Sequence, residues 1–217
     1  AYLLKSEKHD TEVILKEEII THKKIIPKGF ILKLGLITLL LYFSDFLIRP
    51  FFSLYWESLS VYKTKLVSGS IYAIPGFVAL ITLWVNNKRN TEEGYKGIIN
   101  ALCIGIVGLF LQGIPSEMAI IIGRIIYGWA IFKGVVKFDI LLFELSSPEL
   151  YAIDYSKIHF FQNLGVLLAS LSIGVVVENY GLRVPFSIAF LGFLITLIAY
   201  YFVFKSVRIS HKELAKT

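Results

Sequence analysis

Long apolar runs, separated by short polar connections, dominate the pattern of the chain. Six of these runs are about 18 to 25 residues long, and a helix of that length crosses a hydrocarbon core of about 30 Å because each residue adds about 1.5 Å. We therefore predict six membrane-spanning helices. Their expected ranges are 30–51, 67–85, 97–114, 117–145, 158–177 and 184–204.

Polar sequence flanks the six runs. Residues 1–28 are predicted to form a cytoplasmic segment with a short surface helix before Pro27, residues 29–206 the transmembrane domain, and residues 207–217 a cytoplasmic tail. The chain opens with Ala1 and shows no signal-peptide pattern, so we expect it to begin within a longer protein. Charged residues make up 18% of the chain, whereas soluble domains contain about a quarter. The composition thus agrees with a membrane protein.

Lysine and arginine gather on alternate connections. The segment before the first span, the connections near residues 90 and 157, and the tail are basic, whereas the opposite connections hold only Lys63, Lys65 and Arg183. Basic residues near span ends mark the cytoplasmic side. We therefore expect a multi-pass protein with both termini in the cytoplasm, in the inner membrane of a bacterium. These flanking positions also explain the net charge of +6 by contact with anionic lipid, without nucleic-acid binding.

Small residues recur inside the spans, where they let helix backbones approach each other closely. Glycines at 105, 108, 123 and 128 are interpreted as packing positions. Pro50 and Pro75 are expected to bend their spans, with the freed carbonyls met by neighbours or water. Cys103 is the single cysteine, so no internal disulfide can form, and we interpret it as a packing residue.

Several short stretches follow one another in a characteristic order and spacing. They are Arg49-Pro50-Phe51, Ser68-Gly69, Gly123-Arg124 with Gly128, 146–149, 165–174, 178–181 and Pro185-Phe186. Together they resemble the C-terminal half of a major facilitator superfamily transporter, helices seven to twelve of twelve, over nearly the whole chain. One departure is the connection 86–90, which keeps the basic residues of a loop signature in that family but lacks its Gly and Asp. A charge-relay role for this connection is therefore in doubt.

The resemblance implies a fold and a function. The fold is an all-α integral membrane bundle of six transmembrane helices, the C-terminal half of a twelve-helix transporter. The function is secondary active transport of a small organic molecule by alternating access against an N-terminal six-helix half, in the same chain or a separate one. The resemblance is closest to efflux members, which use the proton gradient to export drugs or metabolites such as siderophores. It also implies gating or packing roles for Arg124, Gly165 and Gly174.

Charged residues inside the spans are the candidate site, because each costs at least about 2.5–3.5 kcal/mol to insert. Asp45 and Arg49 are four residues apart and are expected to pair on one helical face, either as a structural ion pair or as a substrate or proton site. Lys133 and Lys137 share one face of the fourth span, which we expect to line a water-filled path that favours an anionic substrate. Tyr127 completes this predicted pathway.

Other polar residues of the spans have plainer explanations. Lys137, Asp139 and Glu144 lie either in the path or at the cytoplasmic surface. Lys33 is expected to reach the lipid headgroups. His159 has no partner that the sequence reveals, and we interpret it as an interfacial histidine.

Enzyme signatures are missing from the sequence. There is no Walker phosphate loop, no His-Glu-x-x-His and no Cys/His set with metal-ligand spacing. We therefore predict a protein that is not an enzyme and that uses neither a cofactor nor a metal. Two alternatives to an exporter stay open: an importer of an anionic nutrient or metal–chelate complex, and a membrane scaffold subunit without transport. Lys133 argues against the scaffold, since a passive subunit has no evident reason to tolerate its insertion cost.

Overall fold

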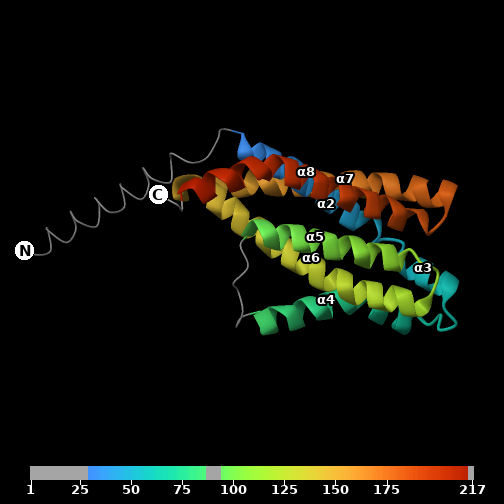
Figure 1. Cartoon of the computed structure of the whole chain (residues 1–217). Helices are drawn as coiled ribbons and strands as arrows, with labels where there is room; N and C mark the ends of the chain where they lie inside the picture. Colours follow the sequence, from blue (N-terminus) through green and yellow to red (C-terminus); the bar gives the residue numbers. More distant parts are fainter. Residues whose placement is uncertain (1–28, 87–93, 215–217) are drawn as a thin grey trace, which may run out of the picture.

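The computed structural model describes residues 29–86 and 94–214, with side chains described for 29–85 and 95–205. The helical elements of this part are α2 (Phe30–Leu47), α3 (Phe52–Leu59), α4 (Lys65–Asn86), α5 (Gly94–Gln112), α6 (Glu117–Leu145), η1 (Pro148–Leu150), α7 (Tyr151–Tyr180) and α8 (Val184–Leu214) (Figure 1). The surface helix predicted before Pro27 lies outside the described residues.

Six segments of the described chain are long and apolar enough to cross a membrane, as predicted. They are Phe30–Leu59, Lys65–Val85, Tyr95–Gln112, Glu117–Leu145, Pro148–Tyr180 and Val184–Lys205. No strand occurs in residues 29–86 and 94–214, so this part is all-α. The two largest differences from the expected boundaries are that α7 begins at Tyr151 rather than near 158 and that α8 continues to Leu214 rather than to about 204.

The first span is divided, although the sequence predicted one continuous helix over 30–51. Between the end of α2 at Leu47 and the start of α3 at Phe52 lies Pro50, which has no N–H with which to continue the helical hydrogen bonds. The α3 helix is fixed by Tyr55, whose hydroxyl donates to the Gln112 carbonyl at the end of α5 (3.1 Å). The break therefore falls just beyond Asp45, at the end of the bundle that holds α3, which we call the α3 end.

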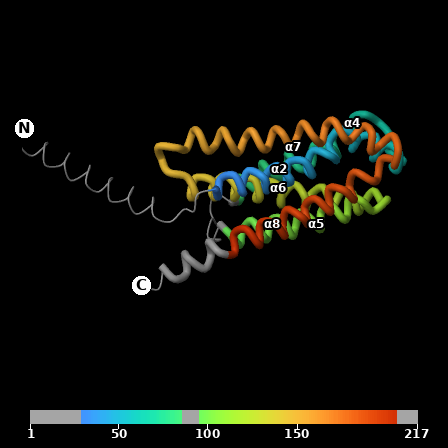
Figure 2. Tube along the Cα trace, turned by 90° about the horizontal axis from the view of Figure 1, so that it is seen from above, coloured from blue at the N-terminus to red at the C-terminus, as the bar shows by residue number. Residues whose placement is uncertain are grey.

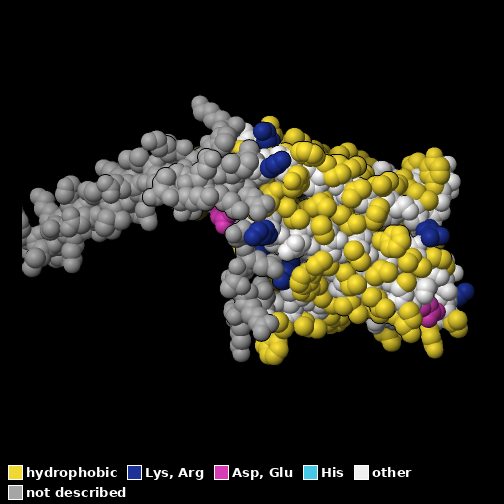
Figure 3. All heavy atoms as spheres, viewed as in Figure 1, with side chains coloured by type: hydrophobic (Ala, Val, Ile, Leu, Met, Phe, Trp, Pro, Cys, Tyr) yellow, Lys and Arg dark blue, Asp and Glu magenta, His cyan; other side chains and the backbone are white. Residues whose placement is uncertain are grey.

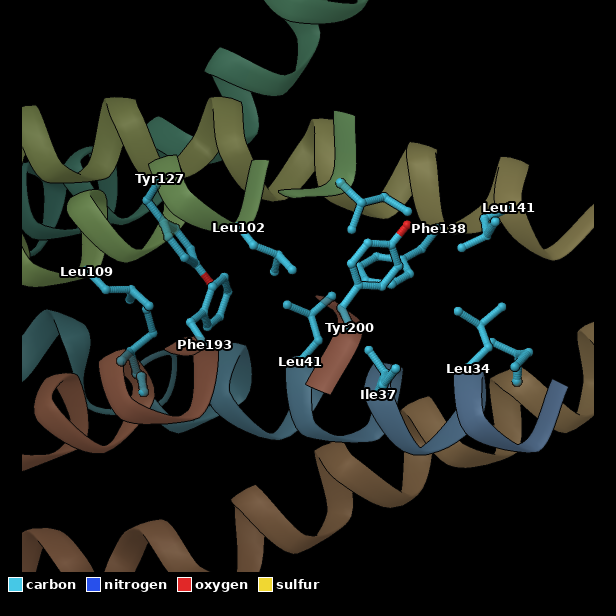
Figure 4. Packing of buried hydrophobic residues seen from close by; sticks show 14 of the residues in the cluster. Leu34, Ile37, Leu41, Leu102, Leu109, Tyr127, Phe138, Leu141, Phe193 and Tyr200 are labelled. Carbon is cyan, nitrogen blue, oxygen red and sulfur yellow. The ribbon is translucent and has the colours of Figure 1, made fainter. Parts of the chain in front are cut away.

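The helices lie roughly side by side along one long axis (Figures 1 and 2). The α2 helix packs against α7, α8 and α6, whereas α5 packs against α6 and α8. Between them lies a core that includes Leu34, Leu41, Leu102, Phe193 and Tyr200 (Figure 4). The α4 helix packs on α6 and α3, and only 11% of its apolar 18-residue stretch is buried. Most of its apolar surface therefore faces outward.

The surface follows the same division. On the face shown in Figure 3, apolar side chains cover the middle of the described bundle, and the charged side chains gather toward its two ends. This distribution places the apolar band in the hydrocarbon region and the charges near the headgroups.

Glycines set the closest helix contacts. A Cβ at Gly108 would lie 2.8 Å from the backbone nitrogen of Tyr127. A Cβ at Gly165 would overlap the carbonyl oxygen of Leu39, so α7 and α2 meet backbone to backbone there, as a packing role requires. Gly174 makes no close helix contact within the described bundle, because it is exposed and no atom lies within 4 Å of a Cβ at that position, and its gating or packing role stays a prediction. Nine residues from Gly165, at about 100° per residue, Gly174 lies on the opposite face of α7.

Candidate functional site

A pocket of about 380 Å³ lies between α2, α4 and α6, toward the α3 end. Its polar lining comes from Asp45, Arg49, Tyr72, Arg124 and Tyr127. All five belong to membrane-spanning segments. Ordinary ligand sites combine an apolar cavity with a few such polar groups. This pocket is therefore the candidate functional site.

Asp45 is the centre of the pocket's hydrogen bonds. One carboxylate oxygen accepts a hydrogen bond from the Arg49 guanidinium, one turn further along, and the other accepts one from the Tyr127 hydroxyl on α6. Asp45 is buried, whereas 42% of the Arg49 side chain is exposed. The pair expected from the spacing of four residues is present. The Arg49 side of this ion pair is partly exposed, because Arg49 follows the end of α2.

Arg124 is the second cation of the pocket, and it is 3% exposed. Its guanidinium lies 4.1 Å from the ring centroid of Phe52 and 5.4 Å from that of Tyr72, and it donates a hydrogen bond to the Tyr72 carbonyl. Its Nε has no hydrogen-bond partner among the described residues. None of the ion pairs in the described part of the chain includes Arg124. The guanidinium is thus held in place by rings and a carbonyl, without a carboxylate of its own.

Pro75 interrupts the hydrogen bonds of α4 one turn beyond the Tyr72 carbonyl that Arg124 meets. Pro75 lies inside α4, where its ring and its missing N–H disturb the hydrogen bonds of the preceding turn. A Cβ at Gly128 would lie 2.5 Å from the Cα of Pro75, so α6 touches α4 at this residue. Arg124 lies one turn before Gly128 and meets the carbonyl of Tyr72, one turn before Pro75. The carbonyl that loses its helical donor to Pro75 is that of Ile71, four residues earlier, so the expectation that a neighbour or water meets a freed carbonyl stays a prediction.

The structure does not bring Lys133 and Lys137 to the pocket that Tyr127 lines, and their place in a substrate pathway stays a prediction. The Lys133 ammonium lies 4.3 Å from the ring centroid of Trp129, and Trp129 lines a different, largely apolar depression. Lys137 is buried, and its Cε would lie 3.1 Å from a Cβ at Gly97 on α5. Six residues separate Tyr127 from Lys133, and at about 100° per residue this turns the lysine well away from the pocket.

The opposite end of the bundle, where α2 begins, has its own polar groups. Asp154 is buried and accepts hydrogen bonds from Ser146 (2.8 Å) and Lys157 (2.9 Å). His159 has a partner that the sequence did not reveal: its Nε2 lies 2.9 Å from the Tyr155 hydroxyl. These groups lie outside the pocket around Asp45.

Comparison with known proteins gives a result for the fold alone. No protein-family model matches the chain, and no curated protein matches it in sequence. Solved structures do match. The peptide transporter POT in complex with sulfate matches with a TM-score of 0.72 and 16% identity, over 85% of this chain and 41% of the transporter. The POT family transporter PepTSo matches with a TM-score of 0.68 and 17% identity, over 81% of this chain and 37% of the transporter.

These matches decide the fold class. The chain has the fold of one half of a major facilitator-type transporter. It spans about two fifths of the length of the transporters it matches, 41% and 37%. Because the sequence identities are only 16% and 17%, these matches establish the fold and not the substrate. What this chain binds must therefore be argued from its own residues.

Proposed function

We propose that this chain forms one six-helix half of a secondary active transporter, which carries a small organic molecule across a membrane by alternating access. The pocket around Asp45 is its substrate and coupling site. The second half comes either from the same polypeptide or from a separate chain. Export is the proposed direction, supported by the sequence resemblance to efflux members, and import of an anionic molecule together with a proton is the second candidate.

One observation carries the proposal: a buried carboxylate inside a membrane span faces a pocket and holds two partners from two helices. A charge at this depth costs at least about 2.5–3.5 kcal/mol to insert, and such charges mark substrate or ion pathways. Asp45 lies in α2, Arg49 lies just past the end of α2 in the same span, and Tyr127 lies in α6. The Asp45 carboxylate thus joins two helices that a rocking motion would move relative to a partner half.

The chemistry of the pair suggests how coupling works. When Asp45 takes up a proton, its charge is lost, and the attraction that holds the Arg49 guanidinium is lost with it. Arg49 is then available to a substrate in the pocket. Release of the proton restores the pair and displaces the substrate. Proton and substrate are thus bound in the same state of the pair and released together, which is the requirement for carrying both in the same direction.

A flux assay on the full-length protein in proteoliposomes tests the proposal. The probes are citrate as an organic anion, alanyl-alanine as a peptide and ethidium as an organic cation, each with and without a pH gradient. We expect at least one probe to move with the gradient. Asp45→Asn is expected to abolish the effect of the gradient while exchange of labelled for unlabelled probe continues, since a neutral side chain cannot exchange a proton.

Asp154→Asn is the matched control, because Asp154 is equally buried and also ion-paired but lies outside the pocket. This variant should keep the response to the gradient. An Asp45→Asn protein that responds to the gradient as the parent does would refute the role of Asp45. No flux of any probe by folded protein would favour the scaffold alternative. Opposite vesicle orientations distinguish export from import.

A further inference from the structure

The Arg124 guanidinium makes no ion pair with a carboxylate of the described residues. The residue is 3% exposed, its Nε has no hydrogen-bond partner in the part of the chain that the structure describes, and its guanidinium donates a hydrogen bond to a neutral carbonyl, that of Tyr72. A buried charge without a counter-ion is strongly unfavourable, and buried arginines are ordinarily paired. The pocket of the described half is therefore electrostatically incomplete.

The charges of the pocket lining do not balance. Two guanidinium groups, those of Arg49 and Arg124, share the pocket with one carboxylate, that of Asp45. Both oxygens of this carboxylate already accept hydrogen bonds, from Arg49 and Tyr127. The lining thus has a formal excess of one positive charge, at a place where the carboxylate has little capacity left for Arg124.

The Arg124 side chain is already held in position before a ligand binds to it. The rings of Phe52 and Tyr72 lie within 5.4 Å of its guanidinium carbon, so the side chain loses little freedom when a ligand arrives. A guanidinium offers a planar set of N–H donors that matches a carboxylate with two parallel hydrogen bonds. The other lining residues include Ile48, Ala73 and Ile131, which give an apolar surface next to the charges.

We propose that the substrate is an organic anion, and that its carboxylate binds Arg124 while a second acidic or polar group takes the place of Asp45 on Arg49. This inference rests on the proposed function, because it assigns the substrate class of the same site. It moves the expected preference for anions from the lysines of α6 to the two arginines of the pocket.

Citrate binding to the full-length protein in lipid nanodiscs, at constant ionic strength, tests the assignment by titration calorimetry. The neutral trimethyl ester of citrate is the ligand control. A hydrogen bond to a charged group is worth about 1.5–3 kcal/mol, so Arg124→Met is expected to weaken citrate binding about 10- to 100-fold. The citrate affinity of Arg124→Lys should lie between those of the parent and Arg124→Met, because lysine keeps the positive charge but lacks the planar set of N–H donors.

Two more variants sharpen the test. Asp45→Asn removes the internal competitor for Arg49 and should strengthen citrate binding. Lys63→Met removes the same unit of charge from an exposed position outside the pocket and should leave the affinity unchanged within about twofold. Equal affinity of parent and Arg124→Met would overturn the assignment, as would equal binding of the neutral ester or no citrate binding by folded parent protein.

One competing explanation is an acidic residue of the partner half that pairs with Arg124. In that case Arg124→Met would lower the melting temperature of the whole protein and leave citrate binding unchanged, which overturns the proposal. The two hypotheses also fail separately. Gradient-driven movement of ethidium or alanyl-alanine without citrate binding would refute the anion and keep the transporter. Citrate binding that depends on Arg124, without flux of any probe, would keep the anion site and refute transport.

Discussion

Gly128→Ala is the substitution that most directly tests how α4 and α6 are joined. The added Cβ would lie 2.5 Å from the Cα of Pro75, 3.0 Å from its Cβ and 3.1 Å from its carbonyl oxygen. The first and last of these are backbone atoms, which cannot turn aside as a flexible side chain can. The two helices must separate, and overpacking of this kind costs about 1–3 kcal/mol.

Gly134→Ala is the matched control on the same helix. A Cβ there would lie 3.7 Å from the Cβ of Ala101, an ordinary van der Waals contact. The control keeps the chemistry of the change and any gain in helix propensity, at most about 1 kcal/mol. The difference between the two variants therefore isolates the clash with Pro75.

Thermal unfolding in detergent, followed by size-exclusion chromatography after heating, measures both variants. For a chain of about 150–250 residues, 1 kcal/mol moves the melting temperature by about 2–4 °C. Gly128→Ala is thus expected to melt roughly 2 to 12 °C below the parent, and Gly134→Ala at or above it. Transport should also fall in Gly128→Ala, because a shift of α4 moves the carbonyl that holds Arg124. Equal melting temperatures for the two alanine variants would refute the reasoning.

Two further predictions concern α7 and the orientation in the membrane. Gly165→Ala should lower the melting temperature by several degrees because its Cβ would overlap the α2 backbone, whereas Gly174→Ala, with open space around it, should change stability by no more than about 0.5 kcal/mol; equal losses would contradict this packing. In a Cys103→Ala background, Tyr62→Cys, 65% exposed at the α3 end, should react with a membrane-impermeant maleimide in intact cells; labelling only after lysis would reverse the topology.

The sequence predicted the elements of the fold because lipid imposes a simple rule on them. A span must be apolar over its whole length, so its position can be read from composition, and α6 begins and ends where expected, at Glu117 and Leu145. The division of the first span was foreseeable in kind, since Pro50 was expected to bend it. Whether a proline bends a helix or ends it depends on tertiary contacts, here the hydrogen bond of Tyr55 to the end of α5.

The candidate site was predicted only in part, because the sequence does not reveal how each helix is rotated about its own axis. The pairing of Asp45 and Arg49 depends on spacing within one helix, which sequence alone provides. Which face of α6 meets the pocket is different, because a span that is apolar all round gives little sign of its inward side. Lys133 was predicted to line the pathway because it is deeper in its span than Lys137, yet its ammonium lies over the Trp129 ring. Arg124 was noticed in the sequence, but for a gating or packing role and not as part of the substrate pathway.

The contacts that pack α4 on α6 also position the Arg124 guanidinium in the pocket. The pattern of charged residues in the sequence therefore could not by itself identify this site. The guanidinium is placed by a carbonyl of a proline-disturbed helix, and that helix is close because Gly128 lacks a side chain. An arginine fixed by an ion pair, such as Arg49, can bind an anionic ligand only after its carboxylate is protonated or displaced. An arginine fixed by rings and a carbonyl keeps its charge and a free Nε. The contacts that order α4 on α6 are therefore the same contacts that leave a positive charge available in the pocket.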